Sequence, residues 1–220
     1  MPQPPTPDAI VFDLDGTLVD TVGDRITAWA STFRESSIPV TRGQLEPMIG
    51  MDGRRLAREV ADAVGRSLSD ADAEELDRRA GELFDQLNHD PRPLPGATEL
   101  LTGLEERGVR WAIATSSRAE QVARSVAALA LNSEPRIVDG SRVENAKPAP
   151  DLLLLAAREL RADPAATSYV GDSTWDMAAA AAAGMVGIGV LAGTAVDADA
   201  LRGAGARLVV ETLEQLDLGS

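Results

Sequence analysis

The stretch Asp13-Leu14-Asp15-Gly16-Thr17 follows directly after the apolar run Ala9-Ile10-Val11-Phe12. Four apolar residues in a row, bounded by turn-forming residues, predict a short buried β-strand. Gly16 favours a turn at the end of this strand, so we expect both aspartates to face the crevice beyond it. Two carboxylates in one crevice repel each other unless a cation or a proton lies between them. The stretch therefore indicates a metal-dependent site, although Asp and Gly are also common in ordinary turns.

Further polar groups follow other apolar runs along the chain. A run at 110–114 ends in three hydroxyl residues, and a lysine lies in a proline-rich loop ahead of a helix that we expect at 152–160. Two more acids follow a strand expected at 168–170. A parallel sheet would bring all these groups to one edge, where they can hold Mg²⁺ and a phosphoryl group together. The residues are Thr115, Ser116, Ser117, Lys147, Asp172 and Asp176.

The hydrophobic pattern of the remaining chain predicts an α/β fold with a doubly wound parallel sheet. Short apolar runs alternate with helical stretches from about residue 97 onward, which is typical of that architecture. We expect strands at 9–12, 109–114, 137–138, 168–170, 186–191 and 208–210.

The segment between the first strand and residue 90 has a different pattern. It carries charged residues and alanine at amphipathic helical spacing and contains no convincing strand. We therefore expect a core formed by residues 1–20 and 91–220 and a small α-helical cap formed by residues 21–90. Linkers near Thr21 and at 91–96 would join the two parts.

Composition limits the classes of partner. The chain has 220 residues, 44% of them hydrophobic, and a net charge of −14 from 21 basic and 35 acidic residues. Such an acidic chain has no general attraction for nucleic acid or for an anionic membrane. It contains no cysteine, so thiol chemistry is excluded and a cytoplasmic location is expected. We expect a monomer or weak homodimer.

Two segments bear on membrane targeting. Residues 1–7 contain no basic region and no apolar segment, so we expect a polyproline-like lead-in rather than a secretory signal. Residues 177–196 carry no charge but are mostly alanine and glycine, and glycines divide them into a helix expected at 178–183 and a strand expected at 186–191. No membrane-spanning segment is therefore expected.

At this point the chain resembles the haloacid dehalogenase-like (HAD) hydrolases. The resemblance covers residues 8–216 and rests on DLDGTLVD at 13–20, Thr115, VENAKPAPDLL at 143–153 and GDSTWD at 171–176. It points to the branch with an early helical cap, which contains phosphoglycolate phosphatase and β-phosphoglucomutase. The resemblance implies a Rossmann-like core and a Mg²⁺-dependent phosphomonoester hydrolase that acts on a small phosphorylated metabolite through an aspartyl-phosphate.

Phosphoryl chemistry suggests a role for each group. We expect Asp13 to be the nucleophile and Asp15 the general acid and base. Asp13 and Asp172 would bind Mg²⁺, and the resemblance adds that Asp15 binds it through its backbone carbonyl. Asp176 would orient Lys147 or a metal-bound water. The residues expected to hold the phosphoryl oxygens are Thr115, Ser116 and Lys147.

Each of these residues also has a purely structural explanation. Asp172 and Asp176 are acids suited to a helix N-terminus, and Ser117 suits the cap of a helix that begins near Arg118. Their occurrence in order behind Asp13 and Asp15 favours the functional interpretation. Trp175 is expected to pack at the rim of the site.

Substrate recognition is assigned to the cap. Arg54 or Arg55, in the loop at 49–55, would bind a second anionic group of the substrate, or both would begin a solvated helix. β-Phosphoglucomutase-like members carry a histidine on the first cap helix, and residues 22–26 contain none. Phosphoglucomutase-type transfer nevertheless stays an alternative.

Two other classes are weighed as well. A phosphorylation-driven receiver domain also places an acidic pocket, a hydroxyl and a lysine on a doubly wound sheet, but it is shorter and lacks the helical insertion. A haloacid dehalogenase would use Asp13 to attack carbon and would need neither Asp15 nor a metal.

Overall fold

The computed structural model describes residues 7–216, and its centre is a six-stranded parallel sheet. The strands lie in the order β3-β2-β1-β4-β5-β6, with every neighbouring pair parallel. The predicted doubly wound α/β fold is confirmed. The strands are β1 (Ala9–Phe12), β2 (Arg110–Ala114), β3 (Ile137–Val138), β4 (Thr167–Gly171), β5 (Val186–Val190) and β6 (Leu208–Val210).

Helices cover both faces of the sheet because the residues of β1 are apolar on both sides. Ile10 and Phe12 belong to one buried cluster with α5 (Ala97–Glu106) and α6 (Ala119–Ala128). Ala9 and Val11 belong to another with α7 (Asp151–Leu160) and α8 (Thr174–Ala183). The remaining elements of this part are α9 (Ala198–Gly203) and the 3₁₀ turns η2 (Gly140–Arg142), η3 (Pro164–Ala166) and η4 (Leu213–Gln215).

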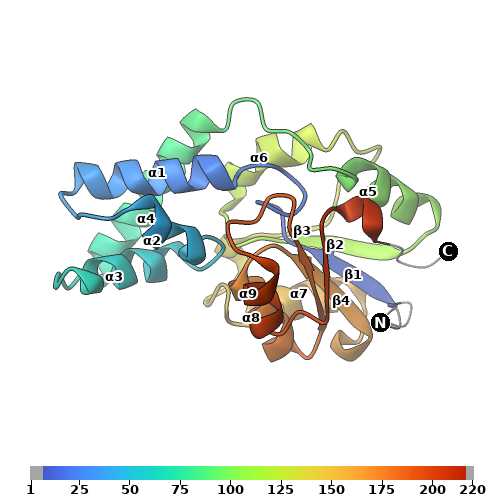
Figure 1. Cartoon of the computed structure of the whole chain (residues 1–220). Helices are drawn as coiled ribbons and strands as arrows, with labels where there is room; N and C mark the ends of the chain where they lie inside the picture. The colour runs from blue at the N-terminus through green and yellow to red at the C-terminus, as the bar shows by residue number, and fades with distance from the viewer. Residues whose placement is uncertain (1–6, 217–220) are drawn as a thin grey trace.

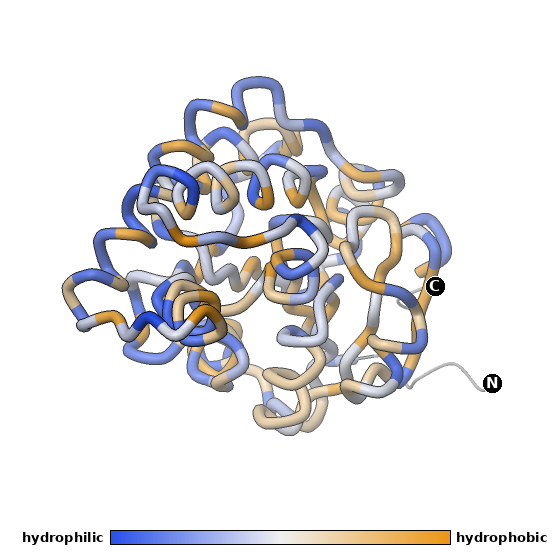
Figure 2. The backbone as a smooth tube through the Cα atoms, turned by 60° about the vertical axis from the view of Figure 1, so that its left-hand side comes forward, coloured by the Kyte–Doolittle hydropathy of each residue, from blue (hydrophilic) through white to orange (hydrophobic). Residues whose placement is uncertain are grey.

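The chain between β1 and α5 is helical, as expected, and Figure 1 shows its helices beside the sheet. They pack around an apolar cluster of their own that includes Trp29, Phe33 and Leu56. Polar and apolar residues alternate along the helices, as the colours of Figure 2 show, so each helix has one side suited to burial. The elements are α1 (Val22–Glu35), α2 (Arg42–Leu45), η1 (Glu46–Met48), α3 (Gly53–Ala63) and α4 (Asp70–Leu87). The domain boundaries at 20/21 and 90/91 stay a prediction.

Strand register places the ends of the three central strands at one level. Phe12, the last residue of β1, pairs with Ile113 on β2 and with Val170 on β4. The next residues of β1, β2 and β4 therefore emerge side by side, at the point where the chain order changes direction across the sheet. Ligand sites of open α/β sheets form at this crevice.

Element ends differ slightly from the predictions. The helix expected to cover the alanine-rich segment begins at Thr174, ahead of the alanines, because Ser173 and Asp176 form a capping box there. In the described residues no helix is both long and apolar enough to cross a membrane. The prediction for residues 1–7 falls mostly outside the described range.

Candidate active site

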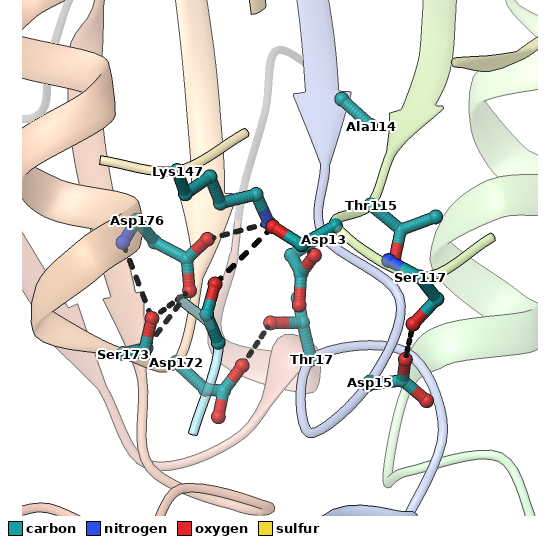
Figure 3. Close-up of polar contacts among 12 residues, drawn as sticks. Asp13, Asp15, Thr17, Ala114, Thr115, Ser117, Lys147, Asp172, Ser173 and Asp176 are labelled. Carbon is teal, nitrogen blue, oxygen red and sulfur yellow. Dashed lines mark hydrogen bonds and ion pairs between the residues drawn. The ribbon is translucent and has the colours of Figure 1, made fainter. Parts of the chain in front are cut away.

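Three buried carboxylates meet beyond the ends of β1 and β4. One oxygen each from Asp13, Asp172 and Asp176 lie within 4.8 Å of one another. Lys147, from the loop before α7, reaches into this cluster and forms ion pairs with Asp13 and with Asp176, the latter at 2.8 Å. Figure 3 shows the lysine between these two acids. The cluster thus combines three acids with one ammonium group and has an excess of negative charge.

Asp176 is held by protein donors on both of its oxygens. Its Oδ1 accepts a hydrogen bond of 2.9 Å from the Tyr169 hydroxyl, and its Oδ2 accepts bonds from the backbone N–H and hydroxyl of Ser173. Burial opposes the charge of Lys147, but the charges of Asp13 and Asp176 outweigh it and raise the pKa of the ammonium group. Asp176 therefore positions a charged Lys147 beside Asp13.

Asp13 and Asp172 have unfavourable surroundings as anions. Burial raises the pKa of Asp13 to about 7, an effect that Lys147 opposes and Asp176 reinforces. Burial and the charges of Asp176 and Asp13 raise the pKa of Asp172 as well. Lys147 offsets only part of the negative charge of this cluster, and carboxylate oxygens at short range are the ligands that a hard divalent cation prefers. The residues present therefore fit a divalent metal ion.

The turn after β1, at Gly16 and Thr17, lies directly against Asp172 at the end of β4. Gly16 has φ +84°, and a Cβ at this position would lie 2.4 Å from Oδ2 of Asp172. Only glycine allows both the backbone conformation and this close approach. Thr17, the next residue, donates a hydrogen bond of 2.9 Å to Oδ1 of Asp172. The turn and the end of β4 are thereby fixed to each other.

Asp15 lies apart from the carboxylate cluster and has different partners. Its carboxylate accepts hydrogen bonds from Ser117 at 2.6 Å and Thr21 at 2.7 Å, and it forms an ion pair with Arg25 at 2.9 Å. Burial alone would raise the pKa of Asp15, but the charge of Arg25 and the hydroxyl hydrogen bonds hold it below its usual value. The side chain is therefore an ionised and firmly oriented carboxylate.

A cavity opens between these groups and the helices α1–α4. It has a volume of about 60 Å³, and its core side carries Asp13, Asp15 and Lys147 together with the hydroxyl residues Thr115, Ser116 and Ser117. Its other side is formed by residues of α1, α3, α4 and the loop before α3, among them Arg25, Trp29, Ile49, Met51, Leu56 and Asp77. A ligand in this cavity would contact the acids on one side and the helices on the other.

Comparison with known proteins shows the family. A family model for haloacid dehalogenase-like hydrolases matches residues 10–190. The chain belongs to this family. It is similar to "Probable phosphatase IndB" of Dickeya dadantii, with 33% identity over 94% of this chain and 90% of that protein. It is also similar to β-phosphoglucomutase of Bacillus subtilis, with 29% identity over 83% and 82% of the two chains.

A solved structure agrees with the family. The crystal structure of a hydrolase from Pseudomonas syringae matches with a TM-score of 0.89 and 33% identity, covering 94% of this chain and 95% of that one. The predicted family and its fold are confirmed for this HAD-like hydrolase.

Arg54 and Arg55 of this HAD-like hydrolase lie away from the cavity that contains Asp13. The Arg54 guanidinium pairs with Asp52 at 3.0 Å and donates to the backbone carbonyl of Glu144. Arg55 pairs with Glu59 and lies 5.2 Å from the ring centroid of Trp175. A direct substrate contact by either arginine stays a prediction, and it would require a substrate that extends beyond the cavity.

Several site residues escaped the sequence analysis. The sequence predicts Ser117 among the hydroxyl residues of the site or as a helix cap, but it does not predict its contact: the helix begins after Arg118, and the serine hydroxyl donates to Asp15. Four further residues received no role in the site, although Thr17 belongs to the stretch at 13–17 and Thr21 lies only six residues from its partner Asp15. Threonine, arginine and tyrosine are common in helices and strands, so their type alone does not indicate these contacts. The four residues are Thr17, Thr21, Arg25 and Tyr169.

Proposed function

We propose that this protein is a Mg²⁺-dependent phosphomonoester hydrolase that acts on a small phosphorylated metabolite through an aspartyl-phosphate on Asp13. The metabolite is phosphoglycolate-like or a sugar phosphate. The observation that carries this proposal is the position of Asp13, which faces a cavity and lies between a buried lysine and a second carboxylate. A carboxylate nucleophile beside an ammonium group suits attack on an anionic phosphoryl group.

The residues around Asp13 offer binding groups for the phosphoryl oxygens. Lys147 provides a positive charge at the cavity wall, and the hydroxyls of Thr115 and Ser116 line the same wall. Thr115 follows β2 directly, so its side chain is placed by the sheet. These groups would hold the phosphorus in line with Asp13 and offset the charge of its oxygens.

Asp13 and Asp172 would hold the metal ion, and the backbone carbonyl of Asp15 would complete the protein ligands. The ion, when bound, supplies charge neutralisation between the phosphoryl group and the two carboxylates. Asp176 would position Lys147 rather than bind the metal ion, since protein donors already contact both of its carboxylate oxygens.

Asp15 would transfer the protons. Its carboxyl group would protonate the alkoxide as the ester bond to phosphorus breaks, and would then take a proton from the water that hydrolyses the aspartyl-phosphate. Arg25 favours the ionised carboxylate, so its contact with Asp15 has to weaken before the first of these steps. The helices α1–α4 would exclude bulk water from the cavity during the reaction.

The test is phosphate release from p-nitrophenyl phosphate and from a panel of phosphorylated metabolites. We expect turnover with Mg²⁺ and none after exhaustive chelation, with recovery when Mg²⁺ is restored. Unchanged turnover after chelation would contradict the metal dependence. No turnover of any ester would remove the phosphatase proposal.

Phosphoglucomutase-type transfer is the second candidate, because β-phosphoglucomutase of Bacillus subtilis is among the relatives. It would use the same aspartyl-phosphate and pass the phosphoryl group to a sugar hydroxyl instead of water. Incubation with β-glucose 1-phosphate and a trace of β-glucose 1,6-bisphosphate separates the two: a hydrolase releases phosphate, whereas a mutase forms glucose 6-phosphate. The predicted cytoplasmic location and monomeric or weakly dimeric state stay predictions.

A further inference from the structure

Arg25 has an unusual position for an arginine on a helix surface. It belongs to α1, yet its side chain is 14% exposed and reaches across to the core. Its guanidinium lies 3.4 Å from the centroid of the Phe84 ring on α4 and donates to Gln121 on α6 at 3.1 Å. Its other terminal nitrogen, Nη2, donates to both Asp15 and Ser117. Contacts from α4, from α6 and from the loops after β1 and β2 thus hold the guanidinium in one orientation at the cavity wall.

The charges that line the cavity give this arginine a distinct place. Among the described residues, the cationic side chains at the cavity wall are Lys147 and Arg25. Lys147 is paired with two carboxylates at the nucleophile end. Arg25 lies beside Asp15, the acid assigned to the leaving group, so the alcohol part of a bound ester would lie next to Arg25. Of the two cations, Arg25 is therefore the one that meets the organic part of the substrate.

We propose that Arg25 is a specificity-determining residue that binds a carboxylate on the alcohol part of the substrate. This inference rests on the proposed phosphatase function and specifies its substrate class. The planar guanidinium already pairs with a carboxylate, that of Asp15, and a carboxylate is, with phosphate, one of the two groups that its donor geometry fits. A substrate carboxylate would share or replace this contact while Phe84 and Gln121 keep the guanidinium in place.

The rest of the cavity is compatible with a short carboxylic acid. Its volume is small, about 60 Å³, which favours a substrate with a short organic part. Asp77 is the one further acid on the helical side of the wall among the described residues, and its charge is offset by Arg118 at 2.6 Å. Trp29, Ile49 and Leu56 add apolar surface. The preferred substrates would be short phosphorylated hydroxy acids.

The experiment compares matched esters that differ in this one charge. The first pair is 2-phosphoglycolate and ethylene glycol monophosphate, and the second is 3-phosphoglycerate and glycerol 3-phosphate. kcat/KM is measured for each with the wild type and with Arg25→Gln, Arg25→Lys and Arg34→Gln. Arg34 is the matched control, because it is an exposed arginine on the same helix, hydrogen-bonded to Ser31. p-Nitrophenyl phosphate reports the general activity of each variant.

We expect the wild type and Arg34→Gln to prefer the carboxylate ester in at least one pair. In Arg25→Gln this preference should fall at least tenfold, the scale of one lost charge-assisted contact, and Arg25→Lys should retain part of it. A merely structural defect would lower both members of a pair alike and leave their ratio unchanged.

Three results would overturn the inference. One is an unchanged ratio in Arg25→Gln. Another is a wild type that shows no preference in either pair, and the third is a wild type that hydrolyses p-nitrophenyl phosphate but none of the four esters. By contrast, a wild type without activity on any ester would contradict the proposed function itself.

Discussion

The two aspartates at the end of β1 lie two residues apart in different electrostatic surroundings. Asp13 is 4% exposed and contacts Lys147, and burial raises its pKa. Asp15 accepts two hydroxyl hydrogen bonds and faces Arg25, so its pKa is lowered. Neighbouring groups thus shift the pKa of the same residue type in opposite directions, which suits the two different roles proposed for these aspartates.

This difference predicts distinct defects for the two amide variants. Asp13→Asn should abolish the phosphoenzyme, because an amide is a poor nucleophile, and should lower kcat by several orders of magnitude. Asp15→Asn should lose turnover to a similar extent yet retain substrate and metal binding, since its metal contact is expected through the backbone carbonyl. Rapid-quench trapping of phosphoenzyme and calorimetric binding of Mg²⁺ distinguish them. Near wild-type rates in Asp13→Asn would mean that water attacks phosphorus directly.

At the scale of elements, the segment from Pro47 in η1 to Asp52, just before α3, is joined to the core at several points. The indole N–H of Trp175 donates to the carbonyl of Pro47 at 2.9 Å, and the N–H of Asp52 donates to the carbonyl of Lys147 at 3.0 Å. The Ser116 hydroxyl donates to the carbonyl of Gly50 at 3.3 Å. The helical part is therefore closed over the site through a loop that contacts the residues around Lys147 and Asp172.

Trp175 lets this closure be tested without touching the carboxylates. Trp175→Phe removes one hydrogen bond and Trp175→Ala also removes the ring beside Arg55, each a loss of about 1 kcal/mol. We expect hydrogen–deuterium exchange of the segment at 47–52 to rise about fivefold in Trp175→Phe and further in Trp175→Ala. Exchange in α7 is the internal control and should not change. Equal exchange in all three proteins would show that the tryptophan does not hold the loop.

The sheet and the principal acids follow from local sequence signals. Apolar runs of two to six residues predict the strands, and Asp13, Thr115 and Asp172 come directly after β1, β2 and β4. Register then brings them together, because neighbouring parallel strands end at one edge. The start of α8 differs from the prediction because a capping box at Ser173 outweighs the alanine pattern on which that prediction relied.

The contacts of the helical part could not be predicted in this way. Arg25 meets Gln121 across 96 residues of sequence, and Ser117 meets Asp15 across 102. Amphipathic spacing shows which side of a helix is apolar, but it does not distinguish a solvated arginine from one that crosses to another element. For this reason the sequence predicts Arg54 or Arg55 as a substrate contact and does not indicate Arg25.

At the scale of the whole molecule, negative charge is concentrated in the site as well as on the surface. The chain carries a net charge of −14, and three buried acids share one lysine. Repulsion among buried like charges lowers the stability of the folded state, and a bound cation removes that cost. Metal binding and stability should therefore be coupled.

Asp172→Asn tests this coupling, because the amide removes one charge but keeps an oxygen that can accept the hydrogen bond from Thr17. Without divalent ions we expect the variant to melt at or above the wild-type temperature. Mg²⁺ at 100 times its Kd should raise the wild-type Tm by about 5–10 °C, from about 2.7 kcal/mol of binding free energy, and should leave the variant nearly unchanged. Asp199→Asn, at a side chain that is 94% exposed, is the control and should respond to Mg²⁺ like the wild type. Two results would contradict this coupling. An equal metal-induced shift of the Tm in Asp172→Asn and in the wild type would place the cation outside the Asp13–Asp172 pair. A lower Tm of the metal-free variant than of the metal-free wild type would show that Asp172 stabilises the fold even as an unpaired charge.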